Sequence, residues 1–245
     1  MERVTRIMKS IGIIGYGEIG QALDDIYLEN GYEPRIKDLD RDDDLKYVDV
    51  LNICIPYSHK FVHQVLAYIE DIEPEMVIIH STVPPGTTFS IAQTFPKICH
   101  SPVRGVHPNL YEGIQTFVKV FGGHASAEAS KHFCEDLNVE TEVYESAVAT
   151  EIAKLLDTSY YGVCIAWHDY AHKLCKKFGV NFTEAQTHYN ETYNEGYTTL
   201  EKENVIRPTL TPPLGSIGGH CVVPNAELLR EELDSKLLES ITDLK

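Results

Sequence analysis

The sequence lacks the features that mark several specialised classes of protein. No apolar run approaches the roughly 20 residues that a membrane-spanning helix needs. The chain contains no internal repeat and no low-complexity linker. Residues 1–10 include no small-residue cleavage site, so we expect no signal peptide and a cytoplasmic protein.

Basic residues are scarce. The 21 Lys and Arg residues face 37 Asp and Glu residues, which gives a formal net charge of −16 at pH 7. A field of this sign repels phosphate backbones and anionic lipids, so nucleic acids and membranes are poor candidate partners. We therefore expect a small-molecule substrate, and an anionic one requires a local positive site.

Cysteine pairs at metal-binding or redox spacing are also missing, because the six cysteines include no Cys-x-x-Cys motif. Five of them lie in apolar segments and are interpreted as small core residues in a reducing compartment. They are Cys54, Cys99, Cys134, Cys164 and Cys175. Cys221 differs because it lies in a glycine-rich loop, where a thiol has room to react.

Residues 9–145 alternate strand-like, β-branched runs with helical stretches. The predicted strands cover residues 10–15, 33–38, 48–55, 76–81, 97–99, 117–121 and 139–144. The predicted helices cover residues 18–30, 59–71 and 125–137. The run 48–55 is apolar throughout, which is typical of a strand buried on both faces of a parallel sheet. The alternation predicts an α/β fold with a doubly wound, Rossmann-type parallel sheet.

From about residue 146 the pattern becomes helical. Residues 146–178 contain no Pro and carry apolar side chains at helical spacing, which predicts one long helix. A second helical stretch begins at Thr183, and a Pro- and Gly-rich loop at 207–224 precedes a closing helix at 225–241. We expect two parts, a dinucleotide-binding domain over residues 1–146 and a helical dimerisation and substrate segment over residues 147–245.

A glycine-rich loop, Gly15-Tyr16-Gly17-Glu18-Ile19-Gly20, follows the first apolar strand and opens a helix. The first glycine permits a tight turn, the second lets a pyrophosphate approach the backbone, and the third lets the helix pack against the strand. The helix N-terminus offers free N–H groups and a positive dipole end to phosphates. This context predicts a dinucleotide site. A loop that holds S-adenosylmethionine, or no nucleotide at all, is the alternative.

Asp38 lies 18 residues past Gly20, at the end of the second predicted strand. A carboxylate there binds the adenosine ribose and repels a 2′-phosphate, and Asp40 is close enough to share the role. NAD is therefore favoured over NADP, although three nearby basic residues keep NADP open; these are Arg35, Lys37 and Arg41. Pro56 and Thr82, which follow two further predicted strands, are the remaining candidate cofactor contacts.

Three further segments carry recognisable motifs, STVPPGTT at residues 81–88, EIAKL at 151–155 and IGGHCVVP at 217–224. The first is similar to a motif of the UDP-glucose/GDP-mannose dehydrogenase family, and the last resembles the GIGGHC-x-P segment around that family's catalytic cysteine. Residues 151–155 (EIAKL) look like the start of the family's long central helix. With the glycine loop, these matches follow the family's order along nearly the whole chain.

The resemblance implies a Rossmann domain followed by a helical dimerisation segment. It also implies NAD-dependent oxidation of a nucleotide-sugar alcohol to the acid, through a cysteine thiohemiacetal and a thioester. In this sequence it makes Cys221 the nucleophile and Lys154 the catalytic lysine. A nearby cation or backbone N–H groups activate a thiolate, and a lysine stabilises a developing oxyanion. The alternatives are a small buried cysteine and a solvated surface lysine.

The sequence departs from the family at three proton-handling positions. Asn109 stands where the family's S-P-E segment supplies a catalytic glutamate. Thr158 replaces an asparagine, and Asn225 replaces an aspartate that activates water. Because asparagine cannot act as a general base, we expect thioester hydrolysis to lack its proton acceptors. The printed sequence also ends before the family's nucleotide-holding third domain, so we expect a small or unusual alcohol or aldehyde substrate.

Histidines offer one further candidate. His107, next to a Pro-Asn turn and predicted at the end of a strand, is a candidate general base or substrate contact in place of the missing acid. A hydrogen-bonded loop histidine is the alternative. His168 and His172 have the i, i+4 spacing of metal ligands, but no third ligand is evident, so we expect no metal.

Three functions fit these residues. The first is an NAD-dependent oxidoreductase related to the nucleotide-sugar dehydrogenases. The second is an S-adenosylmethionine-dependent methyltransferase on the same scaffold, and the third is a non-catalytic nucleotide-binding protein, because fold does not fix chemistry. The long helix resembles the family's dimer helix and needs a cover for its apolar face, so we expect a homodimer.

Overall fold

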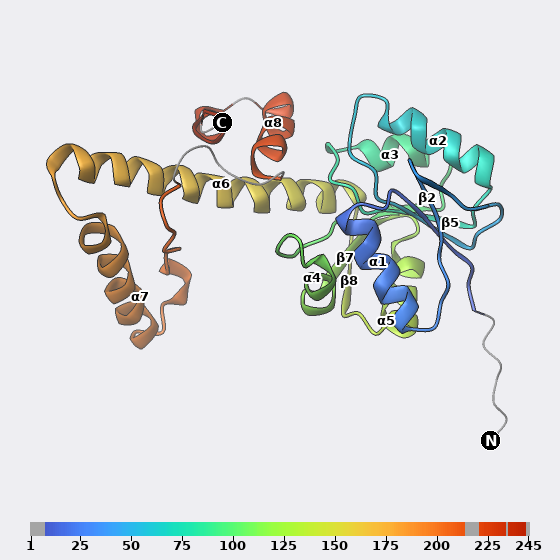
Figure 1. Cartoon of the computed structure of the whole chain (residues 1–245), viewed down its shortest axis with the longest axis horizontal. Coiled ribbons are helices and arrows are strands. Elements are labelled where there is room, and N and C mark those ends of the chain that lie inside the picture. Colours follow the sequence, from blue (N-terminus) through green and yellow to red (C-terminus); the bar gives the residue numbers. More distant parts are fainter. Residues whose placement is uncertain (1–7, 214–220, 234, 244–245) are drawn as a thin grey trace, which may run out of the picture. The chain divides into compact units, whose positions relative to one another are not determined.

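The structure, a computed structural model, describes residues 8–213, 221–233 and 235–243. The chain divides into two compact units within its longest helix. The first unit ends at Lys154 and the second begins at Leu155. Figure 1 follows the chain through both, and each has a hydrophobic core of its own.

The first unit is built on one eight-stranded sheet with the order β3-β2-β1-β4-β5-β6-β7-β8. The strands are β1 (Ile11–Ile14), β2 (Arg35–Asp38), β3 (Arg41–Asp42), β4 (Val50–Ile53), β5 (Met76–Ile79), β6 (Ile98–His100), β7 (Lys119–Gly123) and β8 (Thr141–Tyr144). Neighbours are parallel except in the β2–β3 and β6–β7 pairs. The sheet is therefore mostly parallel, as predicted for a doubly wound, Rossmann-type fold. The carboxyl ends of β1, β2, β4, β5 and β6 share one edge, and β7 begins there.

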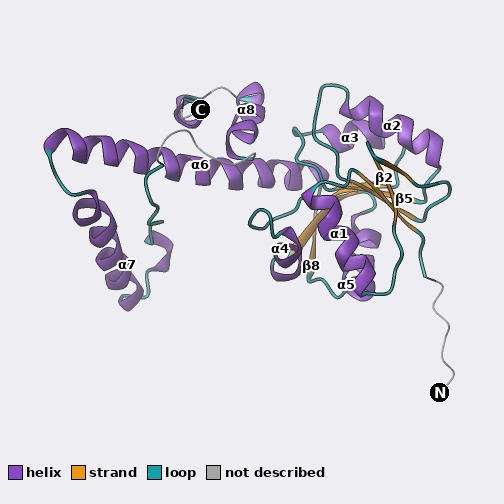
Figure 2. Cartoon of the chain, viewed as in Figure 1, coloured by secondary structure: helices purple, strands orange, loops and turns teal. Residues whose placement is uncertain are grey.

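Helices cover both faces of this sheet, as Figures 1 and 2 show. They are α1 (Glu18–Glu29), α2 (Phe61–Ile72), α3 (Thr87–Ala92), α4 (Leu110–Thr116) and α5 (Ser126–Leu137). One apolar cluster packs α1, α4 and α5 on one face, and a second packs α2 and α3 on the other. Successive strand residues alternate between them, Val50 in the first and Leu51 in the second, because side chains alternate across a strand. This confirms the doubly wound α/β prediction.

Several details of the first unit differ from the sequence predictions. The sequence pattern missed β3, α3 and α4, which are two to seven residues long and follow turn-forming residues. Cys134 is exposed, so its prediction as a core residue is wrong. It lies on α5 beside Phe133, which faces the sheet, and the neighbouring position on the helix points outward.

The second unit is helical in its described residues. Its elements are the remainder of α6 (Ala147–Phe178), a π-helical turn η1 (Thr183–His188), α7 (Tyr189–Thr199), a 3-10 turn η2 (Glu203–Val205), α8 (Val222–Glu232) and α9 (Lys236–Thr242). The long helix α6 confirms the prediction for residues 146–178. Even this helix is not apolar enough to cross a membrane, and no other helix in the described residues is long and apolar enough to do so.

The single closing helix predicted for residues 225–241 is wrong. The backbone is extended at Leu233, and the Ser235 hydroxyl accepts the N–H of Leu237 at 3.2 Å as the N-cap of α9. Helices α8 and α9 pack on α6 where Gly162 leaves room for them. A Cβ at that glycine would lie 2.7 Å from Val222 Cγ1 and 3.0 Å from two Ile241 atoms. The small residue therefore sets how closely the last helices approach.

Candidate functional site

The turn between β1 and α1 has the shape that a dinucleotide loop needs. Gly15 adopts a φ of +92°, and a Cβ there would lie 2.8 Å from the backbone of Cys54, the residue after β4. A Cβ at Gly20 would lie 2.0 Å from the Gly15 carbonyl oxygen. A Cβ at Gly17 would meet no described atom within 4 Å. Two glycines thus fold the loop, and the third leaves open space before the N-terminus of α1, where a phosphate would bind.

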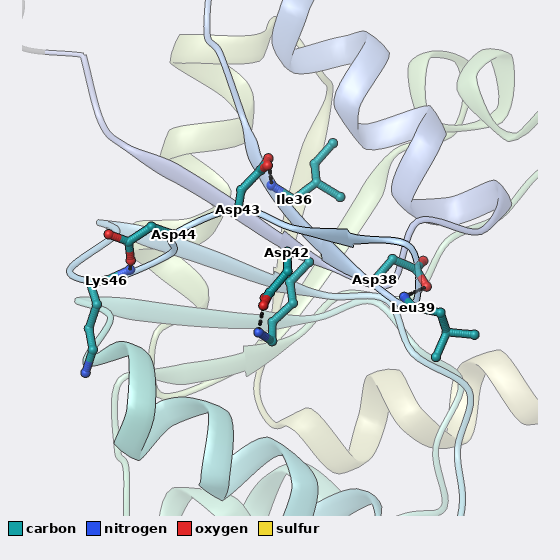
Figure 3. A network of polar contacts seen from close by, with 8 residues as sticks. Ile36, Asp38, Leu39, Asp42, Asp43, Asp44 and Lys46 are labelled. Atoms are coloured by element: carbon teal, nitrogen blue, oxygen red, sulfur yellow. Dashed lines mark hydrogen bonds and ion pairs between the residues drawn. The ribbon is translucent and has the colours of Figure 1, made fainter.

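Asp38 is tied directly to this loop. Its carboxylate accepts the backbone N–H of Leu39 at 2.5 Å (Figure 3) and also the N–H of Tyr16. These two backbone hydrogen bonds, the Leu39 one first, lower the pKa of Asp38 below its ordinary value. The carboxylate is therefore charged at neutral pH, at the carboxyl end of β2 and next to the glycine loop.

The side chain of Tyr16, the second residue of the glycine loop, is held in place by two contacts. Its hydroxyl donates to the Asp24 carboxylate of α1 at 2.6 Å, and this hydrogen bond, followed by burial, raises the tyrosine pKa to about 12. The Arg41 guanidinium lies 5.9 Å from the centre of the Tyr16 ring. The side chain is thus held on both sides, which fixes the backbone N–H that reaches Asp38.

The basic residues near Asp38 are engaged by the acidic segment 38–44. Asp42, whose dashed contact Figure 3 shows, pairs with Lys37, and Asp43 pairs with Arg41 at 2.9 Å. Arg35 Nη1 donates to the Asp44 carbonyl at 2.6 Å. Because each cation already has a partner, a 2′-phosphate would have to displace one.

The other predicted cofactor contacts follow β4, which neighbours β1, and β5, the next strand in the sheet. Pro56 is exposed three residues after β4, and Thr82 is half-buried three residues after β5. The Ser81 hydroxyl donates to the Ile55 carbonyl at 2.6 Å, which joins the two strand ends. Ligands of open α/β sheets bind at this edge.

His107 was predicted at the end of a strand, but it lies in an exposed loop seven residues beyond β6. Its Nδ1 contacts the Glu18 carboxylate in the first turn of α1, and both side chains are about half exposed, at 49% and 47%. The structure thus brings two predicted site residues together across 89 positions. Asn109, two residues later, is exposed and precedes α4.

The side chain of Lys154 contacts the connection between β6 and α4, the same segment that carries His107. Its Nζ donates to the Val103 carbonyl at 2.9 Å. Val103 ends the segment Ser101-Pro102-Val103, directly after β6. A Ser-Pro pair therefore lies beside the predicted catalytic lysine, and sequence reasoning missed it. Its third residue is valine, so this position also lacks the carboxylate of an S-P-E segment, as Asn109 does.

Thr158 and Asn225 are partners in the second unit. The Asn225 amide, in the first turns of α8, donates to the Thr158 hydroxyl on α6 at 3.1 Å. An amide in this role donates a hydrogen bond and cannot take a proton from water. Cys221 is the half-buried N-cap residue of α8, one turn before Asn225. Residues 217–220 of the cysteine motif lie outside the described residues.

A cluster of buried polar groups beneath the carboxyl edge was also missed. His80 contacts Asn52 at 2.9 Å and the Ser101 carbonyl at 3.0 Å, and that carbonyl also accepts from Lys119 Nζ at 3.2 Å. Burial, the largest cause, lowers the pKa of Lys119 to about 7 and holds that of His80 well below its ordinary value. The only sequence signal was a lysine inside the apolar run FVKVF at residues 117–121.

His168 serves structure rather than metal binding. Its Nδ1 contacts the Cys164 carbonyl at 2.6 Å, and its Nε2 accepts the Leu210 N–H at 3.2 Å, so backbone groups occupy both ring nitrogens. Within the described ranges, no group of three His, Cys, Asp or Glu side chains is arranged to hold a metal ion.

Known proteins that are similar to this chain, in sequence or in structure, are named as dehydrogenases. No protein-family model matches the chain. A UDP-N-acetyl-D-mannosamine dehydrogenase of Methanocaldococcus jannaschii is 25% identical over 219 residues, which are 80% of this chain and 48% of that protein. Similarly named proteins of other archaea match at comparable identity. The chain is related to the nucleotide-sugar dehydrogenases. It spans about half the length of these curated relatives.

Solved structures share the fold. A UDP-D-ManNAc dehydrogenase from Pyrococcus horikoshii superposes with a TM-score of 0.79 at 19% identity, over 96% of this chain and 68% of that one. A 3-hydroxyisobutyrate dehydrogenase from Mycobacterium tuberculosis superposes with a TM-score of 0.71 at 16% identity. The match covers 97% of this chain and 92% of that chain. These likenesses agree with the Rossmann-type fold of the sheet and its helices.

Proposed function

We propose that the chain is an NAD-dependent oxidoreductase that acts on an alcohol or aldehyde group. The observation that carries this proposal is the ionised Asp38 held against the N–H of Tyr16 in the glycine loop. A carboxylate at this place accepts hydrogen bonds from both ribose hydroxyls of NAD and repels the 2′-phosphate of NADP. The dehydrogenase names of the relatives support the same reading.

The residues at the carboxyl edge fit a dinucleotide. Gly17 and the α1 N-terminus offer open backbone to the pyrophosphate, and Asp38 offers its carboxylate to the adenosine ribose. Pro56 and Thr82 border the space beyond the ends of β4 and β5. When bound, the nicotinamide supplies the hydride acceptor for oxidation of the substrate.

Each candidate catalytic residue has a separate role in this proposal. Lys154, held by the Val103 carbonyl, orients the reacting oxygen and stabilises negative charge on it. His107, or the Glu18 carboxylate that it contacts, accepts the alcohol proton. Cys221 contacts the substrate or acts as the nucleophile toward an aldehyde.

Oxidation stops after two electrons in this proposal. The Asn225 amide donates to Thr158, and neither side chain is a base that can activate water for thioester hydrolysis. The alcohol carbon loses one hydride and its oxygen loses one proton, which leaves a carbonyl product. We therefore expect one NADH for each molecule of substrate, and the substrate is a nucleotide sugar or a smaller alcohol.

Ligand-dependent melting tests the cofactor assignment. A ligand at 100 times its dissociation constant stabilises the fold by about 2.7 kcal/mol, which gives a clear shift in melting temperature. We expect a shift with NAD. The matched control is Gly17→Val, which keeps the fold because no described atom lies within 4 Å of the new Cβ, yet fills the space for the pyrophosphate. A shift with S-adenosylmethionine alone supports the methyltransferase instead, and NAD binding without turnover of any alcohol supports a non-catalytic protein.

We also propose a homodimer formed by the second unit. Large apolar side chains recur at helical spacing on α6 and remain exposed; they are Leu156, Tyr160, Trp167, Leu174 and Phe178. An apolar stripe of this length on a helix calls for a covering partner. Light scattering should give twice the monomer mass of 27.6 kDa, and Trp167→Glu should give the monomer. A monomer at micromolar concentration for the unmodified chain contradicts this proposal.

A further inference from the structure

A pocket of about 160 Å³ lies where β6 begins, β7 ends and α6 starts, with α3 on its other side. The start of β6 is the amino end of that strand. The pocket is therefore at the opposite edge of the sheet from the glycine loop and Asp38, which lie at the carboxyl ends of β1 and β2. All of its lining residues belong to the first unit. It is separate from the proposed cofactor site.

The buried part of the lining is almost wholly apolar. Ala92, Ile98 and Ala147 line the pocket, and each is less than a tenth exposed. Half-buried Val148 lies beside them, and Gly123 contributes no side chain. The two alanines and the glycine leave the space that larger side chains would fill. Such a surface holds water poorly, because an ordered water needs two to four polar partners.

The size of the pocket fits one aromatic ring. Apolar cavities of about 150 Å³ bind benzene, and a second fused ring needs more room. Phe89 adds an aromatic face at the mouth, since its side chain is 58% exposed and makes no ring contact with the described residues. Two aromatic rings attract each other in offset or edge-to-face arrangements. The mouth thus favours an aromatic ligand over an aliphatic one.

One polar atom interrupts the apolar lining. Thr88 is 1% exposed, and its Oγ1 has no hydrogen-bond partner among the described residues. The Glu151 carboxylate lies near this hydroxyl, but its two oxygens accept the backbone N–H groups of Thr88 and Gly86. A buried hydroxyl without a partner is unfavourable, and a ligand that carries a hydroxyl of its own would satisfy it.

The charges around the mouth select an uncharged ligand. The exposed Glu145 carboxylate opposes an anion. The positive ends of α5 and α6, which begin at Ser126 and Ala147, oppose a cation. His124, the other titratable side chain of the lining, is exposed, so water screens its charge. Neither sign of charge is therefore favoured at this position.

We propose that this pocket binds a neutral molecule with a single aromatic ring and one hydroxyl group, a phenol. The ring packs among Ala92, Ile98 and Ala147, and the hydroxyl exchanges a hydrogen bond with Thr88 Oγ1. Because α3 and the first turn of α6 both line the pocket, the bound molecule also stabilises the packing of these two helices. The proposal does not depend on NAD or on any catalytic residue.

Isothermal titration and ligand-observed NMR of the full chain test the pocket with four probes that share one ring. These are phenol, toluene, benzoate and benzylamine. We expect phenol to bind about two to ten times more tightly than toluene, which is the effect of one hydrogen bond. Benzoate and benzylamine should bind more weakly than phenol. The proposal is overturned if phenol shows no saturable binding or if either charged probe binds more tightly than phenol.

Two variants and a matched control locate the binding. Thr88→Val removes the hydroxyl and keeps the shape of the side chain, so phenol should bind no better than toluene. Ala92→Leu fills the pocket and should weaken both probes about tenfold or more. Ala149→Leu adds the same side chain at an exposed position outside the lining and should change neither affinity.

Melting curves without ligand show whether each variant is folded. Thr88→Val should fold, because it removes only an unpartnered hydroxyl, and it tests the site even if Ala92→Leu does not fold. Undiminished phenol binding in folded Ala92→Leu overturns the location of the site. A preference for phenol over toluene that survives in Thr88→Val overturns the role of the hydroxyl and with it the assignment of a phenol.

Discussion

Glu151 on α6 accepts the backbone N–H of Thr88 in the first turn of α3 and so caps that helix. One carboxylate oxygen accepts the Thr88 N–H at 2.8 Å, and the other accepts the Gly86 N–H at 2.6 Å. The two motifs that resemble the nucleotide-sugar dehydrogenases, 63 residues apart, are thus joined by one buried side chain. Burial raises the Glu151 pKa, and the two backbone hydrogen bonds oppose that rise. The motifs therefore have a structural role in addition to any catalytic one.

Replacing this carboxylate should destabilise the first unit. In Glu151→Gln one backbone N–H faces the amide NH₂ and loses its acceptor, which costs about 1–3 kcal/mol for a buried donor. Glu142→Gln on β8 is the control, since that side chain is exposed. Urea unfolding followed by circular dichroism measures both. Equal stability of the two variants would show that the N–H groups of Gly86 and Thr88 do not depend on Glu151.

The charge of Asp38 should decide the choice between NAD and NADP. Asp38→Asn removes the charge and turns an amide NH₂ toward one of the two backbone N–H donors, Tyr16 or Leu39. NAD should therefore bind about tenfold to a hundredfold more weakly, the loss of a hydrogen bond to a charged group. NADP should bind more tightly than it does to the unmodified chain. Isothermal titration with both cofactors measures this. Asp42→Asn, which breaks only the ion pair with Lys37, should preserve the preference for NAD over NADP. If both variants lost this preference, the role of Asp38 would be contradicted.

Lys119 should make the fold more stable as the pH rises. Its pKa is about 7 in the folded chain against an ordinary value of 10.5, so between these values the unfolded state holds a proton that the folded state has lost. Stability then rises with pH over this window, by about 1.4 kcal/mol per pH unit for one proton, and is flat below it. Urea unfolding at constant ionic strength from pH 6.5 to 9.5 should show this slope. The slope should be absent in Lys119→Met, and its persistence there would assign it to another group.

Gly162 and Gly196 should respond in opposite ways to alanine. Both lie in helices, where alanine is more favourable than glycine by about 1 kcal/mol. A Cβ at Gly196 on α7 meets no described atom within 4 Å, so Gly196→Ala should gain that amount. A Cβ at Gly162 lies 2.7 Å from Val222, so Gly162→Ala should lose stability as α8 moves away. Thermal unfolding of both variants checks this, and a gain at Gly162 would mean that α8 does not pack there.

Cys221 should react before Cys134 if its thiol is activated. Cys134 is exposed on α5, whereas Cys221 is half-buried at the start of α8, so exposure alone favours Cys134. Timed alkylation with iodoacetamide, followed by peptide mass spectrometry, gives both rates in one sample. We expect Cys221 to be modified faster, and Cys134→Ser to leave its rate unchanged. Earlier modification of Cys134 would remove the case for a nucleophile.

The sequence by itself determined the elements that depend on local patterning. Short, continuous apolar runs predicted most strands, and apolar residues at helical spacing predicted the long helix α6. The two patterns can be told apart because a buried strand is apolar throughout, whereas a helix repeats its apolar residues about every 3.6 positions. The glycine loop and Asp38 were placed correctly relative to β1, α1 and β2, since chain distance fixes them on adjoining elements. Short elements such as α4 span too few residues for a helical periodicity to be recognised in the sequence.

Only the tertiary structure decided which distant residues meet. The pairing of Glu151 with Thr88, of Lys154 with Val103 and of Asn225 with Thr158 joins positions more than 50 residues apart. The antiparallel entry of β7 brings Lys119 to the carboxyl edge, where packing rather than sequence pattern buries its charge. Polar contacts of this kind leave no periodic trace in the sequence, because each depends on the geometry of two elements at once.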